Sequence, residues 1–290
     1  MKKKLLLISI LVLVVVISAV TFSACSQKIS LTKKMTQINI FNEESSKLPE
    51  TMSYKMFDEN NNQIGTYTTT VKEFSSFPKT YLGLDGETTE ANAVYTLSAS
   101  SNTILVYSYE TNLTLLDGSY TKKTISYFDN SLLTIGSYSK VVENGKTTTV
   151  IAKNVNDDRY YFKKYIDGTL SVDESIKNGK YESSPYYDNT MTYMIARNMP
   201  KDDSYTSFSY NTFDIDTLSK TTVTVTNSQT VNPATSEVGY PSREITLSTS
   251  DKILGKTNNL KCYISDATVN GYKGVILKIV EGNYSYVLEK

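Results

Sequence analysis

Few residues in this chain have the types and spacing that chemistry requires. The 290 residues include no histidine and two cysteines, Cys25 and Cys262. Without histidine there is no Ser-His-Asp triad, no Cys-His pair and no His-ligated zinc. Two cysteines are too few for a four-thiolate metal site or a disulfide framework. We therefore expect a non-enzymatic protein with no catalytic residue, no metal site and no cofactor.

Cys262 is the thiol that a nucleophile would need, but its surroundings point to packing. Leu260 and Ile264 flank it at the two-residue spacing of a β-strand, which places all three side chains on one face. A reactive thiol would also need a neighbouring base. Cys262 is predicted to be a small core residue.

Two short motifs resemble known sites without matching them. Ser137 and Lys140 have the Ser-x-x-Lys spacing of penicillin-interacting enzymes, where the motif opens a helix. Here strand-like residues surround it, so the two side chains should lie on opposite faces. The run 58–62 resembles the first half of a calcium loop, but Gln63 stands at the glycine position and Thr69 at the final glutamate position. A polar hairpin turn explains this run better.

Cys25 lies in the most specific motif of the chain. A basic start at residues 2–4 precedes an apolar run over residues 5–20, as in a secretory signal peptide. The run ends in Phe22-Ser23-Ala24-Cys25, which resembles the lipobox of bacterial lipoproteins, where the cysteine is acylated and becomes the new N-terminus. An uncleaved transmembrane anchor is the alternative. Both place the protein at the cell membrane, facing outside the cytoplasm, and Ser26 suits sorting to an outer membrane in a two-membrane cell.

These signals divide the chain into three parts. Residues 1–24 form the signal peptide, residues 25–49 form the acylated cysteine and a polar tether, and residues 50–290 form a single β-rich domain. Cleavage would remove three lysines and leave 27 basic against 30 acidic residues, a net charge of −3. A protein without a basic surplus is not expected to bind nucleic acid.

The elements after residue 50 follow a period of two. Apolar residues alternate with polar ones in runs that indicate strands with one buried face. These runs are Met52, Tyr54 and Met56; Tyr67, Thr69 and Val71; Leu260, Cys262 and Ile264; Val275, Leu277 and Ile279; and Tyr284, Tyr286 and Leu288. Asn144-Gly145 and Asp167-Gly168 predict tight hairpin turns, and residues 281–283 are expected to close the last hairpin. Strands joined by successive hairpins predict an antiparallel meander.

One segment, residues 188–200, has helical spacing instead. Asp188 or Asn189 can cap the helix and Pro200 ends it. Its apolar face comprises Met191, Met194, Ile195 and Met199. Packing on the sheet is the favoured role for this face. The alternative is that these four residues contact an apolar ligand, since flexible methionines suit varied apolar surfaces.

The order of these parts resembles a protein family. The chain resembles uncharacterised secreted β-rich proteins related to the Lol-type lipoprotein carriers. The features that carry the resemblance are the paired segments 50–54 and 64–67, the helix ending at 197–200, the corner at 239–245 and the final hairpin. The resemblance implies a mainly β fold: one curved antiparallel sheet forming an open or half β-barrel, with a short helix packed on it. The carriers shelter acyl chains against the concave face. This chain differs in having a lipid anchor and a single helix.

The leading functional hypothesis is a lipid-anchored binding protein whose concave sheet holds a lipid or other apolar ligand. The alternative is a structural lipoprotein of the cell envelope that holds a protein partner through its sheet edges or its tyrosine-rich face. An enzyme that uses carboxylates, lysine or serine is a third hypothesis, which no motif supports.

Overall fold

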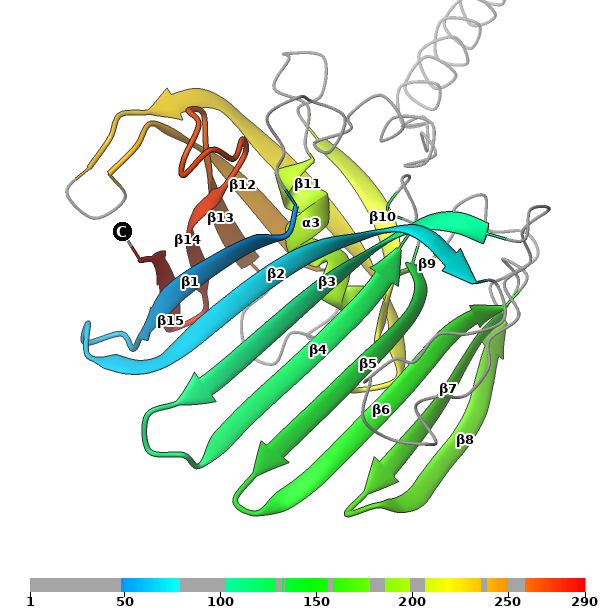
Figure 1. Cartoon of the computed structure of the whole chain (residues 1–290). Coiled ribbons are helices and arrows are strands. Elements are labelled where there is room, and N and C mark those ends of the chain that lie inside the picture. The colour runs from blue at the N-terminus through cyan, green and yellow to red at the C-terminus, as the bar shows by residue number, and fades with distance from the viewer. Residues whose placement is uncertain are drawn as a thin grey trace, which may run out of the picture.

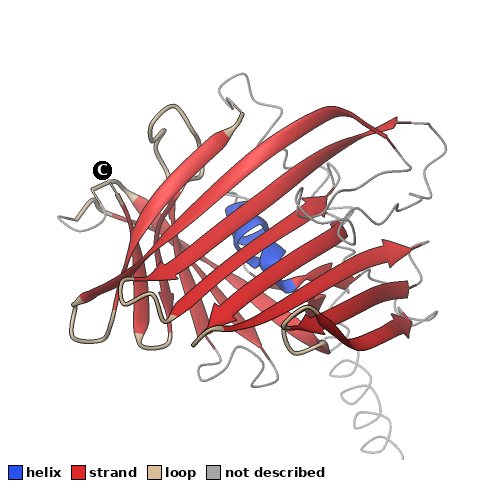
Figure 2. Ribbon diagram, turned by 60° about the horizontal axis from the view of Figure 1, so that its bottom comes forward, coloured by secondary structure: helices blue, strands red, loops and turns tan. Residues whose placement is uncertain are grey.

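The computed structural model describes residues 48–78, 103–128, 132, 134–155, 159–177, 186–198, 207–235, 239–249 and 259–289. These residues form one strongly curved β-sheet with a short helix inside the curve (Figures 1 and 2). The mainly β, open-barrel fold that the sequence predicts is confirmed. Cys25 and Met199 lie outside the described residues, as do the signal peptide and most of the tether.

The sheet has fifteen strands, in the order β8-β7-β6-β5-β4-β3-β2-β1-β15-β14-β13-β12-β11-β10-β9. The strands are β1 Glu50–Phe57, β2 Gln63–Pro78, β3 Thr103–Leu115, β4 Tyr120–Phe128, β5 Thr134–Glu143, β6 Lys146–Val155, β7 Arg159–Ile166, β8 Thr169–Lys177, β9 Tyr186–Asp188, β10 Ser207–Asp214, β11 Ser219–Asn232, β12 Ser242–Thr249, β13 Asn259–Ser265, β14 Ile276–Glu281 and β15 Tyr284–Leu288. The helical part is the 3-10 turn η1, Asn189–Met191, followed by α3, Thr192–Arg197.

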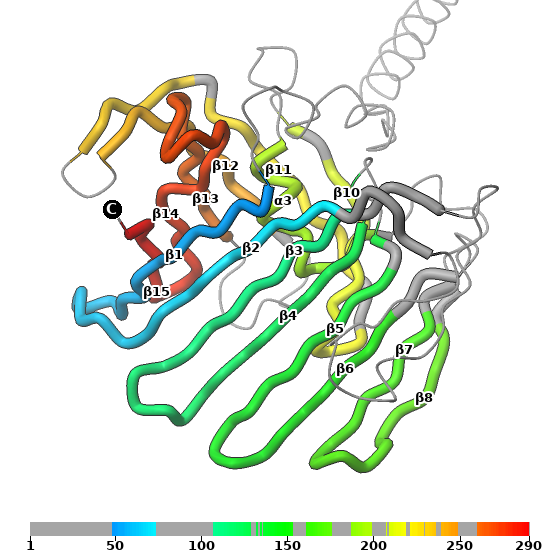
Figure 3. Tube along the Cα trace, viewed as in Figure 1, coloured from blue at the N-terminus to red at the C-terminus, as the bar shows by residue number. Residues whose placement is uncertain are grey.

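Two meanders make up the sheet, and the first and last strands join them. β1 pairs antiparallel with β15, with Tyr54 opposite Leu288 and Met56 opposite Tyr286. This contact places the two ends of the described chain side by side, blue beside red in Figure 3. The predicted antiparallel pairing holds for thirteen of the fourteen neighbouring pairs.

The exception is β9, which pairs parallel with β10. Parallel neighbours need a crossover connection rather than a tight hairpin. The segment containing η1 and α3 lies between these two strands and supplies that crossover. The helix is therefore the element that changes the direction of pairing.

The period-two pattern places one face of each strand in the core. Met52, Tyr54 and Met56 of β1 are all at most 5% exposed, and their neighbours are more exposed. The same alternation holds for Leu260, Cys262 and Ile264 in β13. Tyr284 differs from the prediction: it is 46% exposed, because it begins β15 directly after the hairpin turn, at the edge of the core.

The predicted turns form with the backbone that their residues favour. Asn144 and Gly145 have φ values of 50° and 80°, and Asp167 and Gly168 have 48° and 78°. Two successive positive φ angles characterise the type I′ hairpin turn, which matches the twist of the flanking strands. These turns fix the β5–β6 and β7–β8 registers.

One edge of the curved sheet, β9, contacts the interior strands β4 and β5 through side chains of its own end and of η1. The Asp188 backbone amide at the end of β9 donates to the Thr134 hydroxyl of β5 over 3.2 Å, and the Ser126 and Thr190 hydroxyls bond between β4 and η1. In addition, Phe162 of β7 packs on Phe213 of β10 with ring centroids 5.5 Å apart. These contacts hold the β9 edge and η1 against β4 and β5, and β6 to β8 extend beyond them.

Candidate functional site

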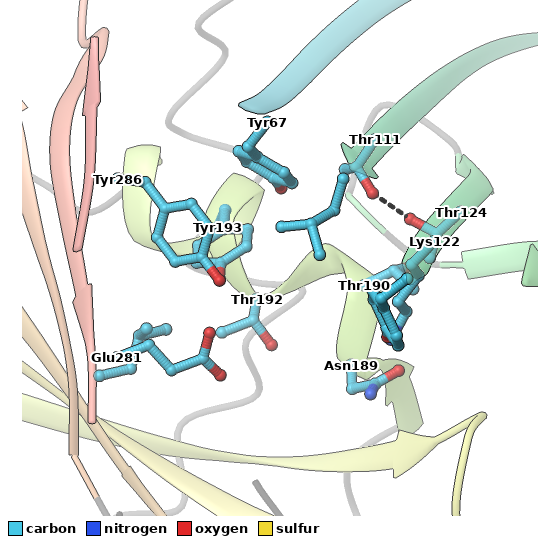
Figure 4. A pocket seen from close by; sticks show the side chains of 13 residues that line it. Tyr67, Thr111, Lys122, Thr124, Asn189, Thr190, Thr192, Tyr193, Glu281 and Tyr286 are labelled. Carbon is cyan, nitrogen blue, oxygen red and sulfur yellow. Dashed lines mark hydrogen bonds between the residues drawn. The ribbon is translucent and has the colours of Figure 1, made fainter. Parts of the chain in front are cut away.

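A partly open cavity of about 280 Å³ lies inside the curve, between the sheet and the η1–α3 segment (Figure 4). Its lining comes from β2, β3 and β4 on one side and from β13, β14 and β15 on the other, with η1 and α3 between them. The lining residues are Tyr67, Thr111, Leu113, Tyr120, Lys122, Thr124, Asn189, Thr190, Thr192, Tyr193, Leu260, Glu281 and Tyr286. The volume is close to the lower end of the roughly 300–1,000 Å³ typical of small-molecule pockets.

One part of the cavity wall is aromatic and aliphatic. Tyr67 lies 5.3 Å from Tyr286 and 6.3 Å from Tyr193, measured between ring centroids. The ring planes meet at 60° and 67°, so the rings are tilted relative to one another and are not stacked. Leu113 and Leu260 complete this part. It can hold an apolar group of a few carbon atoms.

Hydroxyl and amide groups line another part. The Thr111 and Thr124 hydroxyls of neighbouring strands are bonded over 2.5 Å, as the dashed line in Figure 4 shows. Thr190, Thr192 and Asn189 contribute further polar side chains from the helical segment. The leading hypothesis expects a contiguous apolar cavity. The cavity instead has an apolar and a polar portion, so it suits a ligand with both characters.

Lys122 is the one cation in this lining, and its charge is already paired. Its ammonium forms an ion pair with Asp216, whose other carboxylate oxygen accepts a 3.0 Å bond from the Ser139 hydroxyl. Burial lowers the pKa of Lys122, but the Asp216 carboxylate more than offsets this and raises that pKa above its ordinary value. Lys122 therefore stays charged and attached to Asp216.

Glu281 is the acidic residue in the lining. Its carboxylate points into the cavity beside Thr192 and Tyr286 (Figure 4). In the described part of the chain, no hydrogen bond or ion pair joins this carboxylate to another side chain. Burial raises the pKa of Glu281, and the positive charge of Lys122 partly opposes this rise. The lining thus contains one carboxylate, Glu281, and one ammonium, Lys122, whose charge is paired with Asp216 outside the lining.

An ion pair fixes the helix that bounds the cavity. Arg197, the last residue of α3, donates to both carboxylate oxygens of Glu50 over 2.6 and 3.0 Å. Its Nε also donates to the Gly274 carbonyl over 2.9 Å. Both side chains of the ion pair are at most 7% exposed. A bidentate pair of this kind holds α3 at a defined position relative to β1.

Asp188 fixes the other end of the helical segment. Its side chain accepts a 2.8 Å bond from the Thr190 amide and caps η1. Asp188 is fully buried, and burial raises the pKa of its carboxyl to about 6, although Ser137 and Thr190 partly offset the rise. The predicted cap is confirmed. The described α-helix is shorter than expected, because the first turn adopts 3-10 geometry.

The apolar face of this segment packs in the core. Met191, Met194 and Ile195 are each 0% exposed and belong to the main hydrophobic cluster. None of the three lines the cavity. The neighbouring residues Thr192 and Tyr193 line it instead. The packing role that the sequence favours therefore agrees with the structure, and the segment meets the cavity with its other face.

The other candidate sites from the sequence, Cys262, the Ser-x-x-Lys motif and the 58–62 run, also have structural roles. Cys262 is fully buried, and burial raises the pKa of its thiol, so it behaves as a core residue. Ser137 is buried in β5 and Lys140 is exposed on the same strand, as predicted for opposite faces. Asp58 accepts bonds from the amides of Asn60 and Asn62, which makes this run a hairpin turn.

The sequence did not identify the polar residues that line the cavity. Glu281 and Lys122 lie on strands from opposite halves of the chain and share no motif. The one available signal is that Glu281 occurs within the apolar β14 run, next to a predicted turn. Within the described ranges, no group of three or more acidic or cysteine side chains could hold a metal ion, and no helix there has the length and hydropathy of a membrane span.

Comparison with known proteins assigns no family to the chain. No protein-family model matches the chain, and no curated protein matches it. Among solved structures, the chain is similar to the crystal structure of a beta-barrel-like protein of the domain of unknown function DUF1849 from Brucella abortus. The match has a TM-score of 0.46 and 13% sequence identity, and it covers 83% of this chain and 96% of that chain. The description of that protein names neither a ligand nor an activity.

Proposed function

We propose that the protein is a lipid-anchored, extracytoplasmic, non-enzymatic binding protein, related in role to the Lol-type carriers, that holds a small amphiphilic ligand inside its curved sheet. The supporting observation is the cavity between the sheet and η1–α3, with its tyrosine–leucine wall and its separate polar portion. A ligand with an apolar body and a polar head matches both portions. Acylated Cys25 holds the protein on the membrane, facing outside the cytoplasm.

The cavity's size supports a small ligand or one part of a larger one. At about 280 Å³ it suits a single short chain with its head group rather than the several chains of a whole lipoprotein. Apolar burial at about 25 cal/mol per Å² supplies the binding free energy in the aromatic portion. The polar side chains of the lining then fix the position of the head group.

Leu113 provides the most direct test. Its side chain projects into the cavity from β3, and a Leu113→Trp substitution should fill the apolar portion. Thr114 is exposed, and its side chain lies on the opposite face of the strand, so Thr114→Trp is the matched control. The measurement is calorimetric titration of the full chain, held in lipid nanodiscs, with 1-hexanol.

The expected result is saturable binding of 1-hexanol to the wild type and to Thr114→Trp, with binding abolished or weakened at least about tenfold in Leu113→Trp. Hexanol that partitions into the nanodisc lipid contributes equally to all three titrations. Identical isotherms for the three proteins would contradict the proposal.

A further inference from the structure

The charges around the cavity define the class of head group that it accepts. Lys122 is paired with Asp216, so its ammonium is not available to an anionic ligand without breaking that pair. Glu281 has no such partner among the described residues and faces the cavity directly. Glu281 is therefore the ionisable group of the lining that has no ion-pair partner in the described part of the chain.

The tyrosine rings lie next to this carboxylate. Tyr286 and Tyr193 both line the cavity with Glu281, and the charge of Glu281 acts on both hydroxyls. Tyr67 completes the set, with its ring tilted by 60° and 67° to the other two. Three aromatic rings and a carboxylate that line the same cavity have the composition of sites that bind quaternary ammonium groups, because aromatic faces attract cations.

We propose that the cavity binds an organic cation, with the ammonium group held by Glu281 and the rings of Tyr67, Tyr193 and Tyr286. This inference rests on the proposed binding function and names the ligand's head group. The short hydrocarbon part of such a ligand lies against Leu113 and Leu260. An anionic head such as a carboxylate or a phosphate meets the repulsion of Glu281 instead.

The buried carboxylate of Glu281 determines which head groups the cavity favours. A partly desolvated charge without a partner is costly, and burial accordingly raises the pKa of Glu281. A bound cation supplies the missing partner and favours the ionised form. An anion offers no such gain, and a neutral head leaves the cost in place. The ranking of ligands is therefore cation, then neutral, then anion.

The test uses three six-carbon probes that differ in the charge of the head group: hexyltrimethylammonium, 1-hexanol and hexanoate. Each is titrated into the full chain in lipid nanodiscs. The variant is Glu281→Gln, which keeps the shape of the side chain and removes its charge. The matched control is Glu289→Gln, because Glu289 is an exposed carboxylate that pairs with Lys55 away from the cavity.

We expect hexyltrimethylammonium to bind at least about tenfold more tightly than hexanoate, and Glu281→Gln to lose about tenfold of that affinity. Glu289→Gln should bind like the wild type. Unchanged binding of 1-hexanol to Glu281→Gln shows that the variant keeps its cavity, and the comparison of probes on the wild type needs no variant.

Two results would overturn the proposal in different ways. If hexanoate binds as tightly as the cation, or Glu281→Gln leaves cation binding unchanged, the cation inference is wrong while the binding function stands. If none of the three probes binds saturably, the binding function itself fails, and the inference fails with it.

Discussion

Asp188 combines two properties that oppose each other. It caps η1 through the Thr190 amide, and its side chain is fully buried. Burial in a medium of low polarity disfavours a charged carboxylate, which is why its pKa is raised to about 6 from an ordinary value of 3.8. The residue that begins the helical segment therefore makes stability depend on pH.

Substitution Asp188→Asn should remove this dependence, because asparagine caps helices well and carries no charge. A folded-state pKa above the unfolded value stabilises the fold below pH 3.8, and that contribution is lost as pH rises through about 6. We expect the free energy of unfolding of the variant minus that of the wild type to rise by up to about 3 kcal/mol between pH 4 and pH 7.

The measurement is urea unfolding of both proteins across this pH range. Asp173→Asn is the control, since Asp173 is 55% exposed on β8 and pairs with Lys163 at the surface. Its difference from the wild type should stay below about 1 kcal/mol throughout, because an exposed ion pair contributes little to stability. A constant difference for Asp188→Asn would show that Asp188 does not carry the pH dependence.

At this scale the sequence predicted the residues whose role is local and missed those whose role depends on distant neighbours. The Asp188 cap and the burial of Cys262 follow from a few adjacent residues, and both are confirmed. Glu281 gains its importance from Lys122 and Tyr193, which lie on other elements. No local pattern contains that information.

The α3 helix is held by an ion pair that the sequence does not signal. Arg197 and Glu50 are far apart along the chain and meet only because α3 lies inside the curve, against β1. A helix of six residues is not stable by itself. Its buried apolar face and this ion pair keep it in place, and with it the cavity wall that Tyr193 and Thr192 form.

Breaking one side of the ion pair should destabilise the protein strongly. Glu50→Gln leaves the buried Arg197 charge without a carboxylate, which typically costs about 3–5 kcal/mol. The double variant Glu50→Gln with Arg197→Met removes that charge and should lose clearly less. The measurement is the free energy of unfolding in urea at pH 7.

The exposed pair of Lys163 and Asp173 provides the comparison, because both side chains are more than half exposed. Asp173→Asn should cost less than about 1 kcal/mol. Should Glu50→Gln cost no more than this surface control, the ion pair does not hold the helix.

At the scale of elements, strands and turns follow from the sequence because their patterns repeat over adjacent residues. The positive φ values at Asn144 and Asp167 are a case in which residue type and backbone agree. The parallel pairing of β9 with β10 could not be predicted in this way. It depends on where the crossover segment returns the chain, which is a property of the tertiary structure.

At the scale of the whole sheet, two kinds of contact hold the curved shape. Backbone pairing of β1 with β15 joins the two meanders, and side-chain contacts hold β9 and η1 against β4 and β5. A meander predicts neighbouring pairs along the chain, but the sequence contains no signal for pairing of its first and last strands. The curvature that these contacts hold forms the partly open cavity, which a flat sheet would lack.

The central claim is that this cavity holds an amphiphilic ligand, and native mass spectrometry of the full chain purified from its membrane tests it most directly. We expect the wild type and Thr114→Trp to carry a bound amphiphile with a cationic head group, and Leu113→Trp to lose it. A wild-type protein with no bound mass, also after incubation with an extract of its own membrane, would contradict the claim.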